Sequence, residues 1–285
     1  MSSMSPDDLV NKNIKLVSLP AVIQRVNTLL NEPGSSAVDI AECIGQDPAL
    51  TVRLLKFVNS PFYNFPSKIE TLSMAVTVLG TRQLRDLVFA STIVNRFSKG
   101  IDKEFDVEAF WCHSITAGLA ARAIALDKDI PNSERLFIGG LLHDIGVMAM
   151  YLLVPNESFK LKRACRKKKV SYNGLEKEIF GFTHEELGHA LLKAWYFPKS
   201  IYEPILHHHD LTCEDDFKTD TCILHVANVI ANNIQAPVSK VDDTILDQGA
   251  LELLNLDQAT IERYYGKVYS MLDELLELLY YDLAA

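Results

Sequence analysis

The sequence predicts an all-α protein, and three observations support this fold class. Apolar residues recur at intervals of three and four along most of the 285-residue chain, which is the spacing of one helix face. Alternation of apolar and polar residues, the pattern of a half-buried strand, never persists beyond a few positions. Helix-start signals precede many of the periodic segments. With 48% hydrophobic and 23% charged residues, the composition is that of a globular protein.

Residues 1–105 are expected to form an N-terminal lobe of short helices. Pro20 precedes an apolar-periodic segment that should end at the turn formed by residues 31–34, which contains proline and glycine. Asp47 and Pro48 predict the start of the next helix, because aspartate caps helix N-termini and proline is tolerated at the first helical position.

Two further helices are expected before residue 105. Thr71 should cap the first, which should end at Gly80. The second should begin at residue 81 with Leu84 facing inward and with Arg82 and Arg85 facing outward. The two arginines form a candidate anion-binding pair, although two solvated side chains on an exposed face would give the same pattern.

Residues 106–235 are expected to form a larger helical bundle. Two of its helices should cover residues 107–127 and 220–234. Thr183 and Glu186 fit a capping box, which would place the intervening residues in the first turn of another helix.

The remaining residues, 236–285, are expected to form a C-terminal amphipathic segment with one helix over 257–282. Apolar residues form a stripe from Ile261 to Leu279 at helical spacing. The stripe favours packing onto the preceding helices, and the alternative is a seam between two copies of the chain, which would make a homo-oligomer.

Charge and composition narrow the class of function. The formal net charge of −9 disfavours general binding of nucleic acid. Five widely spaced cysteines without a CxxC pair are typical of reduced thiols in a cytosolic protein. The polar, acidic start lacks the features of a signal peptide, and the most apolar stretch, residues 136–154, contains ionisable residues and glycines. We therefore expect a cytoplasmic protein that does not span a membrane.

His143 and Asp144 are the strongest chemical anomaly in the sequence. They are expected to lie within a nearly all-apolar helix capped by Ser133, where an unpaired carboxylate would cost several kcal/mol. A metal ion, a histidinium or an arginine would compensate it. Imidazole and carboxylate ligands together suit iron, manganese, zinc or nickel. The alternative is a hydrogen-bonded pair without a metal.

Several motifs resemble those of one superfamily. LLHDIG, followed by THEELGHALLKAW and HHHD, resembles the HD superfamily of metal-dependent phosphohydrolases. QDPALTVRLLKFVNSPFY, AVTVLGTRQLRDLVFAS and WYFPKSIYEPILHHHD closely resemble the HDOD family, an HD-related output domain of bacterial signalling proteins. The resemblance covers about residues 16–235 and implies an HD-domain, phosphodiesterase-like helical bundle.

The resemblance also implies a set of metal ligands. The positions that match the ligand motifs are His113, His143, Asp144, His184, His208, His209 and Asn228. Asp144 would also be the catalytic ligand if the centre hydrolyses a phosphate ester. Of the three consecutive histidines, we expect His207 to face away from the site, because successive helical positions cannot all face one point.

The chain departs from the superfamily pattern at three points. Asn228 stands where the terminal metal-binding aspartate is expected, and a neutral amide binds a divalent cation more weakly than a carboxylate. Val147 stands where phosphodiesterases of the HD-GYP type usually carry a lysine, and the GYP-like element is absent. These departures argue against hydrolysis of cyclic dinucleotides of the HD-GYP kind. They also predict a partly degenerate metal site.

The favoured functional prediction is a bacterial signal-transduction or regulatory module that acts by binding a signalling protein or a ligand such as a nucleotide. The alternative is a metal-dependent phosphohydrolase acting on a nucleotide or phosphomonoester. Asn228 and Val147 favour the module, whereas the retained histidines and Asp144 favour the enzyme. A third alternative is a scaffold in which the cluster has only a structural role.

Overall fold

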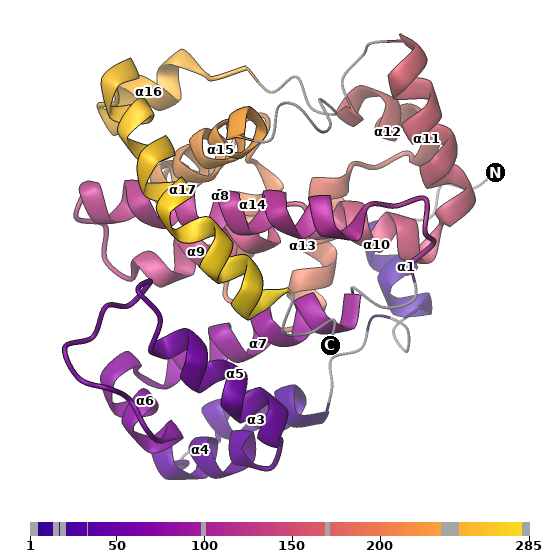
Figure 1. Ribbon diagram of the computed structural model, residues 1–285. Helices are drawn as coiled ribbons and strands as arrows, with labels where there is room; N and C mark the ends of the chain where they lie inside the picture. Colours follow the sequence, from indigo (N-terminus) through magenta and orange to yellow (C-terminus); the bar gives the residue numbers. More distant parts are fainter. Residues whose placement is uncertain are drawn as a thin grey trace. The chain divides into compact units, whose positions relative to one another are not determined.

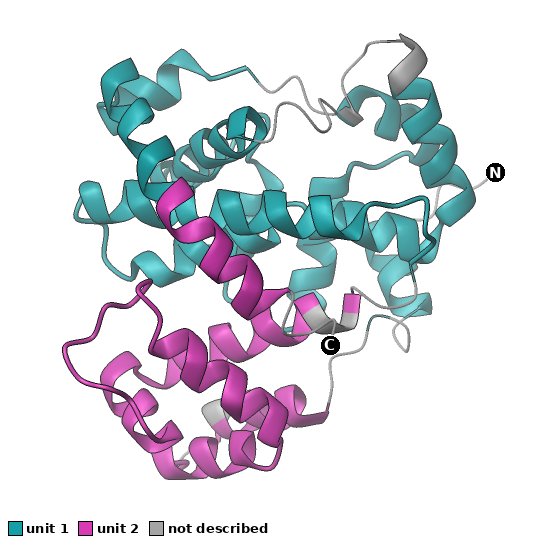
Figure 2. Cartoon of the chain, viewed as in Figure 1, with its two compact units in different colours: residues 1–18, 100–268 teal, residues 19–99, 269–285 magenta. Residues whose placement is uncertain are grey.

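The structure of this protein is a computed structural model that describes residues 5–13, 17, 21–32, 34–97, 101–168, 172–234 and 245–280. Every regular element in these ranges is an α-helix (Figure 1), so the predicted all-α fold class is confirmed. The chain divides into two compact units (Figure 2). Unit 1 comprises residues 1–18 and 100–268, and unit 2 comprises residues 19–99 and 269–285.

These units differ from the three segments expected at 1–105, 106–235 and 236–285. The first helix, α1 (Pro6–Lys12), packs against a helix of unit 1. The indole Nε1 of Trp195 donates a hydrogen bond to the carbonyl of Val17 at 2.7 Å, which also ties the N-terminal residues to this unit. The last helix, α17 (Gln258–Leu279), contributes its first half to unit 1 and its second half to unit 2. Contacts between residues far apart in the sequence therefore decide the division.

Unit 2 is built mainly from five short helices. They are α3 (Ala21–Asn31), α4 (Ala37–Gly45), α5 (Pro48–Val58), α6 (Leu72–Leu79) and α7 (Thr81–Phe97). The predicted caps are confirmed, since Asp47 accepts a hydrogen bond from the backbone of α5 and Thr71 accepts one from the backbone of α6. Gly80 ends α6 with a φ of 84°, a conformation that favours glycine.

Unit 1 holds the remaining helices. They are α1, α8 (Val107–Asp127), α9 (Ser133–Leu142), α10 (Ile145–Leu153), α11 (Pro155–Lys168), α12 (Tyr172–Phe180), α13 (His184–Ala194), α14 (Lys199–Leu206), α15 (Asp215–Ile234), α16 (Gln248–Leu254) and the first half of α17. The long helix α8 packs against both α9 and α15. Helices α8 and α9 approach closely because Gly140 faces the backbone of Ala117, where a Cβ atom would lie only 2.7 Å from the Ala117 carbonyl.

The helix expected to carry His143 and Asp144 is broken at these two residues. Helix α9 ends at Leu142 and α10 begins at Ile145, so His143 follows one helix and Asp144 precedes the next. Ser133 is the first residue of α9 and not its cap; Asn132 takes that position in a left-handed conformation with a φ of 56°. The expectation of one continuous helix was therefore wrong. The break lets neighbouring side chains point to a common centre, which a regular helix would not allow.

The C-terminal stripe is buried within the chain. Tyr264 is 1% exposed, and its hydroxyl donates a hydrogen bond to Asp127 at 3.0 Å. Leu275, in the part of α17 that belongs to unit 2, is also 1% exposed. The packing alternative for the stripe is therefore confirmed for its described side chains.

Two helical stretches, Val107–Asp127 and Ser133–Leu153, have the length and apolar character of a membrane span by composition alone. They are buried over 61% and 78% of their most apolar windows, respectively. Burial of this extent is typical of the core helices of a soluble protein.

Candidate metal centre

The histidines and the aspartate identified in the sequence come together from separate elements of unit 1. His113 lies on α8, the pair His143 and Asp144 lies at the break between α9 and α10, and His184 begins α13. His208 and His209 follow α14, and Asn228 lies on α15. The break and the helix ends matter because they allow side chains to approach one point from several directions.

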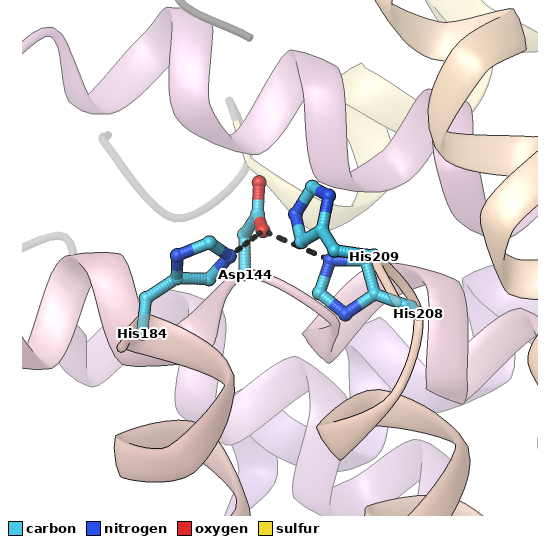
Figure 3. Close-up of side chains that lie close together, drawn as sticks. All are labelled: Asp144, His184, His208 and His209. Atoms are coloured by element: carbon cyan, nitrogen blue, oxygen red, sulfur yellow. Dashed lines mark ion pairs between the residues drawn. The ribbon is translucent and has the colours of Figure 1, made fainter. Parts of the chain in front are cut away.

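One group of possible ligands consists of Asp144, His184, His208 and His209 (Figure 3). Their ligand atoms all lie within 4.8 Å of one another. His184 Nε2 is 3.3 Å from Asp144 Oδ1, and His208 Nε2 is 3.7 Å from the same oxygen. Figure 3 shows the imidazole rings gathered around the carboxylate.

A second group, His113, His143 and Asp144, shares the same carboxylate. Asp144 Oδ2 is 3.3 Å from His143 Nε2 and 3.6 Å from His113 Nε2. The two histidine Nε2 atoms are 3.2 Å apart. Each oxygen of Asp144 therefore faces a different pair of histidines, as expected for a carboxylate that joins two groups of ligands.

Hydrogen bonds on the outer side of the rings fix which nitrogen faces the centre. His143 and His208 each place Nδ1 at 2.7 Å from the backbone carbonyl three residues earlier. His184 places Nδ1 at 2.9 Å from a carboxylate oxygen of Glu176. Because these oxygens only accept, each Nδ1 donates, and a neutral ring then presents the lone pair of Nε2 to the centre.

The chemistry of this donor set fits a divalent metal ion. The Nε2 atoms of His184 and His208 are buried and make no hydrogen bond of good geometry. Two ligand atoms bound to one ion at ordinary metal–nitrogen distances lie roughly 2.9–3.5 Å apart, close to the separations around Asp144. A cation would satisfy both the buried nitrogens and the partly buried carboxylate. The cluster is therefore one that can bind a divalent metal.

The electrostatics of the cluster show how strongly its members interact. Burial lowers the pKa of His113 to about 4, and the neighbouring His143 acts in the same direction. Burial alone would raise the pKa of Asp144, but the histidines around it outweigh this effect and hold the pKa well below its usual range. Burial and the adjacent His208 hold the pKa of His209 well below its usual value. Protons and a cation compete for the same lone pairs, so metal affinity should fall as the pH falls.

Asn228 lies beside the second group of ligands. It is 1% exposed, its Oδ1 atom accepts a hydrogen bond from Nδ2 of Asn232 at 3.2 Å, and its Nδ2 atom is buried without a hydrogen-bond partner. Its interaction with His113 acts to raise the pKa of that histidine, against the larger effect of burial. The structure thus places the amide near His113, and its role as a metal ligand stays a prediction. Because an amide carries no charge, the group of His113 and His143 has less negative charge to offer a cation than it would have with an aspartate.

Glu176 was not identified from the sequence, although it contacts one of the possible metal ligands, His184, directly. It is fully buried on α12, and its Oε2 atom accepts hydrogen bonds from both the backbone N–H and the Nδ1 of His184, each at 2.9 Å. Glu185, the residue that follows His184, lies farther from His184 Nδ1, at 3.4 Å. Sequence separation gives no sign of the Glu176 contact, because it depends on how α12 packs beside α13.

The other histidines lie outside these two groups. His207 interacts with Asp210 through Nδ1 at 3.3 Å, in line with the expectation that it faces away. His225 is buried, donates from Nδ1 to the His208 carbonyl at 2.9 Å and accepts at Nε2 from the backbone of Asp247. His225 therefore holds the backbone that carries His208.

The remaining sequence-predicted positions have other surroundings. Val147 is partly buried on α10, one turn after Asp144. Arg82 is exposed on α7 of unit 2. Arg85 is largely buried, contrary to the expectation that it faces outward, because its guanidinium pairs with the buried Asp86 at 2.7 Å. Neutralising Asp86 accounts for Arg85 without a bound anion.

Comparison with known proteins identifies relatives of this chain. A family model described as the HDOD domain matches residues 16–211. An uncharacterized protein of Treponema pallidum (strain Nichols) is 27% identical over 194 residues, which cover 68% of this chain but only 37% of that relative.

Solved structures from three bacteria share the fold. A candidate phosphohydrolase of Shewanella amazonensis SB2B has a TM-score of 0.74 at 23% identity, over 99% of this chain and 100% of that one. An HDOD domain protein of Geobacter sulfurreducens has a TM-score of 0.68 at 23% identity, over 96% and 98%. A candidate signal transduction protein of Marinobacter aquaeolei VT8 has a TM-score of 0.69 at 16% identity, over 94% of this chain and 60% of that one.

Proposed function

The chain belongs to the HDOD domain family, and we propose that it is a signal-transduction module whose metal centre regulates the binding of a protein partner or a ligand such as a nucleotide. The single observation that carries this proposal is the cluster of inward-facing histidine Nε2 atoms around Asp144. The structural relative from Marinobacter aquaeolei VT8, a candidate signal transduction protein, supports this role.

The proposed ligands of a single divalent ion are Asp144, His184, His208 and His209. This group has four possible ligands, including the carboxylate, whereas the other group has Asn228 in place of a second acid. Iron, manganese, zinc and nickel all accept imidazole and carboxylate together. The four ligands come from α13 and from the ends of α10 and α14, so the ion would fix the relative positions of these helices.

A metal-dependent phosphohydrolase acting on a nucleotide or phosphomonoester is the second candidate function. The retained ligand cluster supports it, and a structural relative from Shewanella amazonensis is described as a candidate phosphohydrolase. A bound ion would supply Lewis acidity to water and to phosphate oxygens. Asn228 and Val147 disfavour this function, because both replace residues that the hydrolytic relatives use to hold a cation or a phosphate.

Metal content is the decisive measurement. The protein is purified without a metal-affinity tag and its metal is determined by elemental mass spectrometry in wild type, Asp144→Ala and Asp144→Asn. The control is Asp210→Ala, which removes an exposed carboxylate near the same histidines in sequence. We expect near-stoichiometric metal in wild type and in the control, and its loss in both Asp144 variants. A folded wild type that binds no added Fe²⁺, Mn²⁺, Zn²⁺ or Ni²⁺ contradicts the proposal.

The same preparations separate the two candidate functions. If metal-loaded wild type hydrolyses nucleotides or phosphomonoesters and Asp144→Asn does not, the phosphohydrolase is correct. If the loaded protein hydrolyses none of them but changes its affinity for a signalling protein or a nucleotide when the metal is removed, the regulatory module is correct.

A further inference from the structure

The surroundings of Glu176 assign it a role beyond those of the metal ligands. Its carboxylate is fully buried, yet its two described hydrogen bonds both go to His184, one to the backbone N–H and one to the ring. Its other oxygen, Oε1, has no hydrogen-bond partner. A buried carboxylate costs free energy unless it is compensated. Here the compensation comes from His184, whose Nδ1 faces Glu176 and whose Nε2 faces the metal centre.

Glu176 is also one of three polar links between α12 and the start of α13. Asn173 donates to Glu185 at 2.5 Å, and Lys177 donates to Glu186 at 3.0 Å. Together with the bonds from His184 to Glu176, three residues of α12 meet three consecutive residues of the first turn of α13. The link at His184 is the one that reaches the metal centre, and it is also the most buried of the three.

The apolar contacts of α12 are with α11, whereas its polar contacts are with α13. This helix packs mainly against α11. Leu161 of α11 and Leu175 of α12 form a small hydrophobic cluster, with Ala164, Cys165 and Phe180 packed around it. We call α11 and α12 together the α11–α12 pair. Helix α11 also packs against α10, where the ring of Phe159 lies 5.1 Å from that of Tyr151. The polar contacts between α12 and α13 therefore add to this packing in holding the pair beside α13.

We propose that Glu176 is the positioning residue of the metal centre, and that through His184 it couples occupancy of the centre to the order of the α11–α12 pair. This inference rests on the proposed function, because it requires that a metal binds at His184. A cation at Nε2 withdraws electron density from the imidazole ring and strengthens the hydrogen bond that Nδ1 donates to Glu176. Because coupling between two sites is reciprocal, a stronger hydrogen bond between His184 and Glu176 of α12 also raises the affinity of the centre for the metal.

Through α12, the coupling would extend from the metal centre to the exposed basic residues of α11. Helix α11 carries several basic residues in an otherwise acidic chain, among them Lys160 and Arg163. Ordering of the α11–α12 pair by the metal would present this helix in one arrangement. The fold therefore contains a physical route by which occupancy of a buried site is reported at a distance from that site.

The test compares three matched glutamate-to-glutamine variants. Glu176→Gln removes the charge that holds His184, Glu185→Gln removes the more distant carboxylate, and Glu178→Gln changes an exposed residue of the same helix. Zn²⁺ affinity is measured by competition with a chelating dye. We expect Glu176→Gln to weaken Zn²⁺ binding by about 10–100-fold, as removal of such a partner of a metal-bound histidine typically does. Glu185→Gln should lose less Zn²⁺ affinity than Glu176→Gln, and the affinity of Glu178→Gln should equal that of wild type.

Hydrogen exchange measured by mass spectrometry supplies a readout that a merely structural role would not change. Zn²⁺ should slow exchange of the α12 amides in wild type and in Glu178→Gln. In Glu176→Gln at saturating Zn²⁺, this protection should be lost. Three results would each overturn the inference. They are an unchanged Zn²⁺ affinity in Glu176→Gln, a larger loss of affinity in Glu185→Gln than in Glu176→Gln, and a rate of α12 exchange in wild type that does not change with Zn²⁺.

A metal-free measurement distinguishes failure of this inference from failure of the proposed function. Nuclear magnetic resonance of the histidine rings reports whether Nδ1 of His184 is protonated and hydrogen bonded. That signature should be present in metal-free wild type and altered in Glu176→Gln. Its absence from wild type overturns the positioning role. Wild type that shows the signature but binds no Zn²⁺ instead overturns the metal centre and, with it, the coupling.

Discussion

At the scale of single residues, Asp144 is the point on which the whole cluster depends. Its carboxylate lies within 3.7 Å of Nε2 atoms from His113, His143, His184 and His208. The histidines turn their lone pairs toward it because their other nitrogens are engaged by carbonyl or carboxylate oxygens. Such an assembly of acceptors around an anion is stable only with protons or a cation between them.

Asn228 is the residue that separates the two groups of ligands in their capacity to bind metal. In the Asn228→Asp variant, a buried carboxylate beside His113 should complete a second set with His143 and Asp144. We expect this variant to bind about twice as much Mn²⁺ or Zn²⁺ per chain as wild type, measured by elemental mass spectrometry.

The metal-free form of Asn228→Asp provides a control. Without metal, the new carboxylate should destabilise the protein, because it would be buried and Asp144, which is partly buried, carries the same charge nearby. A lower melting temperature that rises on addition of metal would agree with this reasoning. If metal content stays at the wild-type value, the amide at this position is not what limits the second group.

At the scale of helices, the centre depends on the close packing of α10 against α13. Gly146, two residues after Asp144, faces the backbone at the start of α13. A Cβ atom there would lie 1.9 Å from the carbonyl oxygen of His184 and 2.8 Å from the Gly188 nitrogen. Because both are backbone atoms, no side-chain rotation relieves the overlap.

Substitution of Gly146 by alanine should therefore separate Asp144 from His184. In Gly146→Ala we expect a fall in the free energy of unfolding of about 1–3 kcal/mol from overpacking, and weaker metal binding because the ligands move apart. Urea unfolding and metal competition measure the two effects.

The matched control for this change is Gly266→Ala on α17. No atom lies within 4 Å of a Cβ built at Gly266, so alanine should be neutral there or stabilise the helix by up to ~1 kcal/mol. If Gly146→Ala behaved like the control, the close contact between α10 and α13 would not be what positions the ligands.

At the scale of the whole molecule, the division into two units separates the metal centre from the short N-terminal helices. All seven sequence-predicted ligand positions lie in unit 1, whereas Arg82 and Arg85 lie in unit 2. Helix α17 contributes to both, and its buried leucines after residue 268 belong to unit 2. We therefore expect the stability of unit 2 and metal binding in unit 1 to be separable properties.

Truncation of one of these leucines tests that separation. Leu275→Ala should lower the free energy of unfolding by ~2–5 kcal/mol, since a fully buried leucine is replaced by a cavity. Metal content of the folded protein should stay at the wild-type value. The control is Tyr269→Ala on the same helix, where the side chain is 57% exposed and its loss should have little effect. Loss of metal in Leu275→Ala would show that the two units depend on each other.

The sequence by itself determined the helical class, several helix starts and the identity of the possible ligands. The caps at Asp47, Thr71 and Thr183 were predictable because a cap depends on residues only three positions apart. The family was recognisable because its motifs preserve residue types in a fixed order along the chain.

Only the tertiary structure decided how these elements meet. Periodicity predicted one helix through His143 and Asp144, but the helix is interrupted there, and both side chains face ligands from distant helices. Glu176 had no sequence signal, since its contact with His184 depends on the packing of α12 beside α13. Local propensities act over a few residues, whereas contacts across the fold depend on the arrangement of the whole chain, and the contacts of Asp144 with His113, His184 and His208 are of this second kind.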